Sequence, residues 1–182
     1  LLEFNMQEVT IPGRSTDTVR FTPFIYGTNA NKWEPGAKNP PLYKVMLFTR
    51  RDGAYREYMP LKIGFGKTEL VDGRLTRFDK ELKLVKAGYN AAADRKTTLA
   101  ELKALKAKGN NTICPDYPQP GWFYDLCDEL GLYVIDCANI NAPEKRDDRK
   151  VGGTPSNDPS LADEYLERVK AMYYRSRNFT CV

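Results

Sequence analysis

The chain has 182 residues, 41% of them hydrophobic and 29% charged, which is typical of a globular protein with a buried core. Its net charge of +4 is dispersed among acidic residues, and no basic stripe with interleaved aromatic residues occurs, so we expect no nucleic-acid partner. No apolar run approaches the ~18–20 residues that span a bilayer. No signal peptide opens the sequence either, so we expect no membrane partner and leave the compartment open.

The sequence contains no histidine, which excludes Ser-His-Asp and Cys-His catalysis and removes the commonest transition-metal ligand. Its four cysteines form no CxxC pair, so neither a zinc ribbon nor a thioredoxin-type site is indicated. Three of them lie within or at the ends of apolar segments, where free cysteines pack as small hydrophobic residues. We therefore expect packed free thiols, no metal site and no cofactor.

Residues 1–70 are predicted to form strands without helices. The segments 2–11 and 18–25 alternate, carry β-branched and aromatic residues, and are separated by turn residues. After a proline-rich loop over 27–41, two further strands are expected at 42–49 and 55–65, joined by a hairpin turn at 51–53. Short antiparallel strands of this kind are typical of a β-sandwich, although this stretch is short for a complete one.

From residue 67 onward the pattern changes. A hairpin is predicted over 67–86, turning at Asp72-Gly73 and again near Asp79-Lys80. Strands are then expected at 82–90, 111–114 and 132–138, and helices at 97–108 and 122–130. Gly109 and Gly131 follow these two helices, where glycine commonly ends a helix in the left-handed conformation.

The stretch 122–140, WFYDLCDELGLYVIDCANI, shows the repeating unit most completely. Its strand, 132–135, is continuously apolar, which predicts burial on both faces, and the polar Asp136 and Asn139 follow at its carboxyl end. A last helix is predicted after Asp158 and Pro159, with an apolar face formed by Leu161, Tyr165, Val169, Met172 and Tyr173. Three successive βα units of this kind predict a parallel sheet with right-handed connections.

These runs resemble glycoside hydrolase family 2, the β-galactosidase and β-glucuronidase group. The stretch 122–140 is similar to the family text FYELCDEYGLYVIDEANIE, LKLVKAGYN to a first barrel strand ending in RGVN, and the tripeptide at 111–113 to an NAVR strand. Asp116-Tyr117-Pro118 stands where the family has SHYP, and 158–178 resembles the helix before NHPSVIIWSLGNE. Further upstream, the sequence resembles the family's immunoglobulin-like sandwich. The segments 33–35 and 41–43 are similar to its LWSPE and LY motifs, and the segment 63–66 is similar to its closing GFR.

The resemblance implies a mixed fold. An antiparallel immunoglobulin-like β-sandwich portion, incomplete, is expected at 1–68, and three βα units of a partial TIM barrel, the (β/α)8 glycosidase barrel, at 69–182. The active sites of such barrels form at the carboxyl ends of the strands. The implied parent is a retaining glycosidase similar to β-galactosidases, which hydrolyses the terminal glycosidic bond of a carbohydrate substrate.

Retaining hydrolysis needs two carboxyl groups ~5–5.5 Å apart. In the family these are glutamates that end barrel strands four and seven, and this sequence ends before strand four is complete. We therefore expect no catalytic residue here and no activity from this chain alone.

The accessory residues also depart from the family pattern. Where the family has NRHEHH after strand one, this chain keeps Asn90 but continues with three alanines and Asp94, in a shorter loop. The SHYP histidine is replaced by Asp116 or lost by deletion, and Cys137 replaces a glutamate of DEANIE. The metal and sugar contacts that the family makes through these side chains are therefore not transferred to this chain.

The candidate substrate-binding residues are Asn90, Asp116, Asp136, Asn139 and Trp122. Each has a structural alternative: the polar groups can bond loop backbone at strand ends, and the tryptophan can pack at the start of its helix. Asp116 and Asp136 could also form a carboxylate pair across neighbouring strands. Trp33 is more typical of an anchor at the sandwich edge than of a sugar platform.

Two functions from different classes remain open. One is a fragment of a family 2 glycosidase, and the other is a non-catalytic carbohydrate-binding or structural module derived from that family. The three alanines and the lack of histidine favour the second, and the length favours the first. Continuation of the parent gene into the catalytic strands would separate them. Because three strands cannot close a barrel, we also expect self-association or association with another chain through the open barrel edge, or packing of the sheet against the sandwich.

Overall fold

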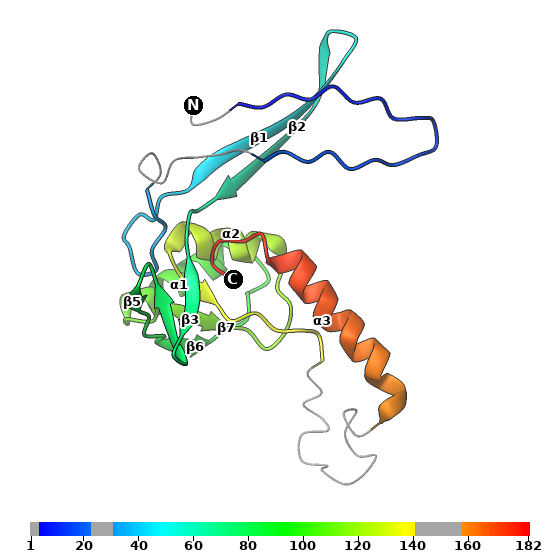
Figure 1. Cartoon of the computed structure of the whole chain (residues 1–182). Coiled ribbons are helices and arrows are strands. Elements are labelled where there is room, and N and C mark those ends of the chain that lie inside the picture. The colour runs from blue at the N-terminus through cyan, green and yellow to red at the C-terminus, as the bar shows by residue number, and fades with distance from the viewer. Residues whose placement is uncertain (1–3, 23–30, 141–157) are drawn as a thin grey trace. The chain divides into compact units, whose positions relative to one another are not determined.

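The computed structural model describes residues 4–22, 31–140 and 158–182 (Figure 1). The chain divides into two compact units, Leu1–Asn31 and Lys32–Val182. Residues 4–22 contain no helix or strand, so the strands predicted at 2–11 and 18–25 are wrong wherever the structure describes them. An alternating pattern becomes a strand only when a neighbouring strand supplies hydrogen bonds, and residues 4–22 join no ladder within the described chain.

The second unit begins with a long antiparallel hairpin of β1 (Tyr43–Arg51) and β2 (Ala54–Ile63), as predicted (Figure 1). Asp52 and Gly53 form its turn with φ of 52° and 76°, the two left-handed residues that a type I′ turn requires. Every residue of β2 before Ile63 is exposed. The hairpin therefore contributes little buried surface.

A small antiparallel sheet follows, with β3 (Thr68–Val71), β4 (Arg74–Arg77) and β5 (Lys80–Glu81) in sequence order. Its first turn lies at Asp72-Gly73, as predicted, with both residues at positive φ. Its second turn lies at Phe78-Asp79, also at positive φ, one residue before the predicted position. The sequence therefore predicted both turns of this sheet.

A parallel sheet comes next, in the order β6–β7–β8, which confirms the three successive βα units. Its elements are β6 (Lys86–Gly88), α1 (Arg95–Ala107), β7 (Thr112–Cys114), α2 (Gly121–Leu130) and β8 (Tyr133–Val134). The strands are shorter than the predicted 82–90 and 132–138, and just before β6 the Asn111 side chain adds bonds to the chain at 83–85. The Asn111 amide accepts from Val85 N–H at 2.8 Å and donates to the Lys83 carbonyl at 2.8 Å. The described strands form no closed barrel.

The ends of these helices follow local rules. The Asp94 carboxylate accepts the Thr97 N–H at 2.8 Å, which caps α1 and lowers the pKa of Asp94. Gly131 ends α2 at φ 68°, as predicted. A Cβ at Gly131 would also lie 3.3 Å from the Glu34 carbonyl and from Pro40, a tight contact, so both the backbone conformation and the packing favour glycine here.

The last helix, α3 (Ala162–Ser176), follows a 3-10 turn, η4 (Pro159–Leu161), and the Asp158 side chain caps that turn as predicted. Its predicted apolar face is only partly covered, since Val169 is 41% and Tyr173 56% exposed. Its one fully buried residue is Ser176, whose hydroxyl belongs to the site described below. No helix of the described residues is long and apolar enough to cross a bilayer.

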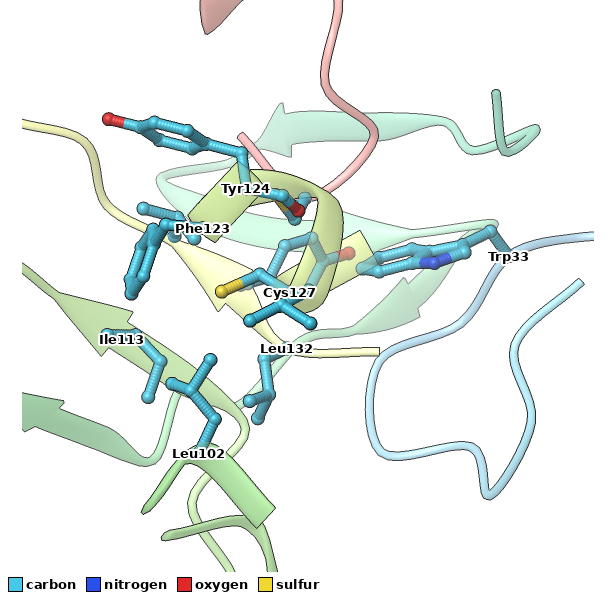
Figure 2. Packing of buried hydrophobic residues seen from close by; sticks show 11 residues of the cluster. Trp33, Leu102, Ile113, Phe123, Tyr124, Cys127 and Leu132 are labelled. Atoms are coloured by element: carbon cyan, nitrogen blue, oxygen red, sulfur yellow. The ribbon is translucent and has the colours of Figure 1, made fainter. Parts of the chain in front are cut away.

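The hydrophobic core lies around β7, β8 and α2 (Figure 2). Leu102, Ile113, Cys127 and Leu132 are fully buried and point toward one another from successive elements (Figure 2). All four cysteines are free, and Cys127 and Cys181 are buried, as expected of packed thiols. Ile135, predicted to be buried, is 44% exposed, although its N–H still donates to the Ile113 carbonyl of β7 at 2.9 Å.

We expected Trp33 to anchor the edge of a sandwich. It lies instead fully buried in this core. Its indole N–H donates to the Asp128 carbonyl of α2 at 2.9 Å, and its ring packs edge-on against Tyr133 with centroids 5.5 Å apart. The buried Arg77 guanidinium lies 5.1 Å from the same ring and donates to the Trp33 carbonyl. Trp33 therefore joins the segment before β1 to the βα units.

Candidate functional site

Polar side chains follow each strand of the parallel sheet at its carboxyl end. Asn90 comes two residues after β6, Asp116 two residues after β7, and Asp136 two residues after β8. Parallel strands bring their carboxyl ends to one edge of the sheet, where barrel enzymes place their active sites. The side chains nevertheless fall into two groups, one exposed and one buried.

The exposed group is a reciprocal pair formed by Asn90 and Asp116. The Asn90 amide donates to Asp116 Oδ2 at 3.0 Å, and the Asp116 N–H donates to Asn90 Oδ1 at 2.9 Å. Both residues are solvent-exposed. An amide beside a carboxylate offers donors and acceptors to hydroxyl groups, which themselves donate and accept. Two of the predicted site residues are therefore brought together in a form suited to a polyol.

The buried group is centred on Asp136, whose side chain is only 4% exposed. Tyr124 donates its hydroxyl to Asp136 Oδ1 at 2.7 Å, while Ser176 Oγ at 2.5 Å and Arg175 Nη2 at 2.9 Å donate to Oδ2. We had expected a bond to loop backbone, but all three donors are side chains. The Asp136 side chain thus links the chain just after β8 to α2 and α3 by hydrogen bonds.

Tyr124 links this buried carboxylate to the rest of the site. Its hydroxyl also accepts the Gln119 N–H at 3.2 Å and Arg175 Nη2 at 2.9 Å. Burial, together with the neighbouring Asp136 carboxylate, raises the pKa of Tyr124 to about 12. The phenol consequently remains a protonated donor throughout the neutral range.

Asp116 and Asp136 therefore do not form one carboxylate pair, because their side chains bond different partners. Asp116 bonds Asn90 in the open, whereas Asp136 is enclosed by three donors. A general acid or nucleophile must reach the substrate. The buried, fully engaged Asp136 is instead suited to supporting the strand ends.

Cys137 lies between these groups, at the position where the family text has glutamate. It is partly exposed, and its thiol lies 3.4 Å from the Asp116 carbonyl and 3.3 Å from its neighbour Ala138 O. Burial and then the charges of Asp136 and Asp116 raise the pKa of the thiol, so it stays protonated. A protonated thiol is a poor metal ligand. No group of three or more His, Cys, Asp or Glu side chains among the described residues could hold a metal ion.

The last two predicted residues lie outside the Asn90–Asp116 pair. Asn139 is exposed, and its backbone carbonyl accepts Arg168 Nη1 of α3 at 2.6 Å. Trp122 is partly buried and packs against the hydrophobic core, which favours the packing alternative for this residue. Neither position carries the hydrogen-bonding geometry seen at Asn90 and Asp116.

Sequence reasoning missed Gln119, Tyr124, Arg175 and Ser176 as site residues. Arg175 and Ser176 reach Asp136 from about forty residues further along the chain, a juxtaposition that no local pattern encodes. Gln119 lies close to Asp116 in the sequence, between two prolines, and its amide bonds Asn90. Its place in the stretch that resembles SHYP was the one available signal.

Comparison with known proteins shows which family the chain resembles. Residues 88–182 match a family model described as glycosyl hydrolases family 2, TIM barrel domain. The β-galactosidase of Lactobacillus delbrueckii subsp. bulgaricus is 31% identical over 163 residues, which cover 80% of this chain and 16% of the relative. That of Pectobacterium atrosepticum is 30% identical over 166 residues, covering 85% and 15%.

Solved structures show the same fold at lower identity. The apo structure of β-glucuronidase from Ruminococcus gnavus is similar with a TM-score of 0.69 at 18% identity, covering 85% of this chain and 27% of that one. A β-glycosidase from Bacteroides vulgatus is similar with a TM-score of 0.60 at 24% identity, covering 83% and 20%.

The chain spans about a sixth of the length of the curated relatives that it matches. The family model nevertheless covers more than half of this sequence and includes β7, β8, all three helices and every candidate site residue. The chain belongs to glycosyl hydrolase family 2, of whose TIM-barrel domain it forms a part.

Proposed function

We propose that this chain forms part of the sugar-binding mouth of a family 2 glycosidase that acts on β-galactosides. The observation that carries the proposal is the reciprocal Asn90–Asp116 pair at the carboxyl ends of β6 and β7. Asp116 Oδ2 is held by Asn90, which leaves Oδ1 to accept a sugar hydroxyl. The choice of galactoside follows the names of the relatives that are about 30% identical.

The proposal assigns binding, but not bond cleavage, to these residues. Of the strand-end carboxylates, Asp116 is exposed and Asp136 is enclosed by Tyr124, Arg175 and Ser176. A pair of accessible carboxyl groups ~5–5.5 Å apart is what retaining hydrolysis needs. We therefore assign the acid/base and nucleophile glutamates to residues outside this sequence and expect no turnover of nitrophenyl β-galactoside by the chain alone.

The domain assignment belongs to the same proposal. We assign residues 1–68 to part of an immunoglobulin-like β-sandwich and residues 69–182 to the first βα units of the barrel. The β1–β2 hairpin supports the sandwich assignment, because its strands expose apolar residues such as Met46, Tyr58 and Leu61. A two-stranded hairpin is marginal alone and gains stability when further strands cover it.

Saturation-transfer NMR with methyl β-D-galactoside tests the binding role. We expect transfer to the wild-type chain, and Asp116→Asn to weaken binding roughly tenfold, since a hydrogen bond to a charged acceptor contributes about 1.5–3 kcal/mol. Asp163→Asn, at an exposed position in the first turn of α3, is the matched control and should bind like the wild type. Equal affinity of both variants, or the absence of wild-type transfer, would contradict the proposal.

We also propose that the chain self-associates through its open sheet edge and exposed apolar surface. One part of the outer edge of β8 is bonded, since the Val134 N–H donates to the Cys181 carbonyl at 2.8 Å. Exposed apolar residues extend over β1, β2 and α3, including Met59 at 48% and Leu166 at 51%. Sedimentation velocity should show concentration-dependent oligomers. A monomer at all concentrations that binds no hydrophobic dye would contradict this expectation.

A further inference from the structure

We propose that Gln119 is a positioning residue that holds Asn90 and Asp116 in the arrangement that binds the sugar. The inference rests on the proposed function, because it explains how the exposed pair keeps its geometry. Gln119 lies between Pro118 and Pro120, just before α2, and is partly buried. It does not touch the sugar in this proposal, but acts through Asn90.

The Gln119 side-chain amide connects the segments that follow two different strands. Its Oε1 accepts the Ala91 N–H at 2.8 Å, in the chain that leaves β6. Its Nε2 donates to the Tyr117 carbonyl at 2.6 Å and to Asn90 Oδ1 at 3.3 Å. The oxygen and the nitrogen of this amide are therefore both engaged by neighbouring chain.

These bonds fix the orientation of the Asn90 amide. Asn90 Oδ1 receives two donors, the Gln119 amide at 3.3 Å and the Asp116 N–H at 2.9 Å. With the oxygen held in this way, Nδ2 faces Asp116 Oδ2. A reversed amide would point its N–H groups at two donors and its oxygen at a carboxylate, which is unfavourable. Gln119 thus helps to decide which oxygen of Asp116 is left for a ligand.

The backbone of Gln119 ties this exposed pair to the buried group. Its N–H donates to the Tyr124 hydroxyl at 3.2 Å, and Tyr124 in turn donates to Asp136 at 2.7 Å. Arg175 donates to both the Tyr124 hydroxyl and the Asp136 carboxylate. One residue therefore connects the carboxyl ends of β6, β7 and β8, and the exposed pair is braced on a buried, enclosed carboxylate.

The chemistry of the position requires an amide rather than an acid. Nε2 faces two oxygen atoms, those of the Tyr117 carbonyl and the Asn90 amide. A glutamate there would direct carboxylate charge at these oxygens at neutral pH. Once protonated, it could donate one of the two lost hydrogen bonds. The ordinary pKa of glutamate, about 4.3, would be raised in such surroundings, so Gln119→Glu should bind sugar better as the pH falls.

The test uses the 182-residue chain and methyl β-D-galactoside as the probe. Gln119→Met keeps the length but removes both donors, and we expect binding to weaken at least roughly fivefold at pH 7.5. Gln119→Glu should lose as much at pH 7.5 and recover part of it at pH 5, relative to the wild type at each pH. Taking this ratio cancels any effect of pH on the neighbouring groups that all the proteins share, among them Asp116, Tyr117, Tyr124 and Cys137. Gln7→Met, at an exposed position, is the matched control.

Amide hydrogen exchange separates this inference from the proposed function. The N–H groups of Ala91 and Asp116 should exchange faster in Gln119→Met. The Ala91 N–H loses its acceptor, Gln119 Oε1. The Asp116 N–H keeps its acceptor, Asn90 Oδ1, but Asn90 is no longer held by the Gln119 amide. No saturation transfer to the wild type would contradict the proposed function. Exchange that is unchanged in Gln119→Met would contradict the positioning role whether or not sugar binds. Unchanged binding in Gln119→Met, or a loss in Gln119→Glu that is the same at both pH values, would also overturn it.

Discussion

The β1–β2 hairpin and the β6–β8 sheet both contain apolar strands, but only the sheet buries them. In the hairpin, Met59 and Leu61 are each 48% exposed, whereas Ile113 of β7 and Leu102 of α1 are fully buried. The difference lies in the connections. A tight turn brings β2 directly back along β1, while β7 and β8 are each reached through a helix that packs against the sheet. Apolar residues therefore stabilise the fold where a crossover helix accompanies them.

The largest expected effect comes from equal substitutions in the two regions. Leu102→Ala opens a cavity in the core and should lower the free energy of unfolding by about 2–5 kcal/mol. Leu61→Ala, on the exposed hairpin, should change it by less than about 0.5 kcal/mol. Urea denaturation of both variants measures the difference. Similar losses at the two positions would show that the hairpin is covered in solution and would contradict the difference between the two regions.

A second test sharpens the description of the sheet region through its buried phenol. The pKa of Tyr124 is raised to about 12 by burial, against about 10 in the unfolded chain. The folded state therefore retains this proton more strongly. The corresponding stability is fully present below pH 10 and is lost as the pH rises from 10 to 12, on the order of 2 kcal/mol in total.

Denaturation series at pH 9 to 12 measure this effect, with Tyr124→Phe as the variant. The substitution should remove that part of the pH dependence and, at neutral pH, lower stability by about 1–3 kcal/mol, because Asp136 loses a donor. Tyr58→Phe, on the exposed hairpin, is the matched control and should leave the pH dependence unchanged. A Tyr124→Phe chain with the wild-type slope would contradict the assignment.

The smallest effect is expected where the two regions are joined by charge. Lys62 of β2 donates to Glu129 of α2 at 2.6 Å, and Arg95 of α1 lies 3.8 Å from the same carboxylate. The lysine side chain is 48% exposed, so solvent screens the pair. Lys62→Ala should cost less than about 1 kcal/mol, and less still at high salt. A loss above 2 kcal/mol would show that this contact, rather than buried surface, attaches the hairpin.

The sequence predicted much of the fold and both residues of the exposed Asn90–Asp116 pair, but not their partner Gln119. α1 and α2 begin and end within two residues of the predicted 97–108 and 122–130, and the glycine that ends α2 and the Asp-Gly turns follow from short-range rules that need only neighbouring residues. Asn90 and Asp116 were predicted as site residues through the family resemblance, which implies a barrel whose active site lies at the carboxyl ends of its strands. The strands predicted at 2–11 and 18–25 do not form within residues 4–22, because a strand needs a partner, which an alternating pattern does not supply.

The sequence by itself determined the order of strands and helices, the family resemblance, and the lack of histidine chemistry, since each depends on residue type and spacing. Only the tertiary structure decided which of the two strand-end carboxylates is exposed and which is enclosed. Asp116 and Asp136 both follow short buried strands, yet Arg175 and Ser176 of a distant helix surround only the second. The tertiary structure likewise brought Trp33 into the core and Gln119 beside Asn90. Long-range packing creates these contacts, and local periodicity carries no information about them.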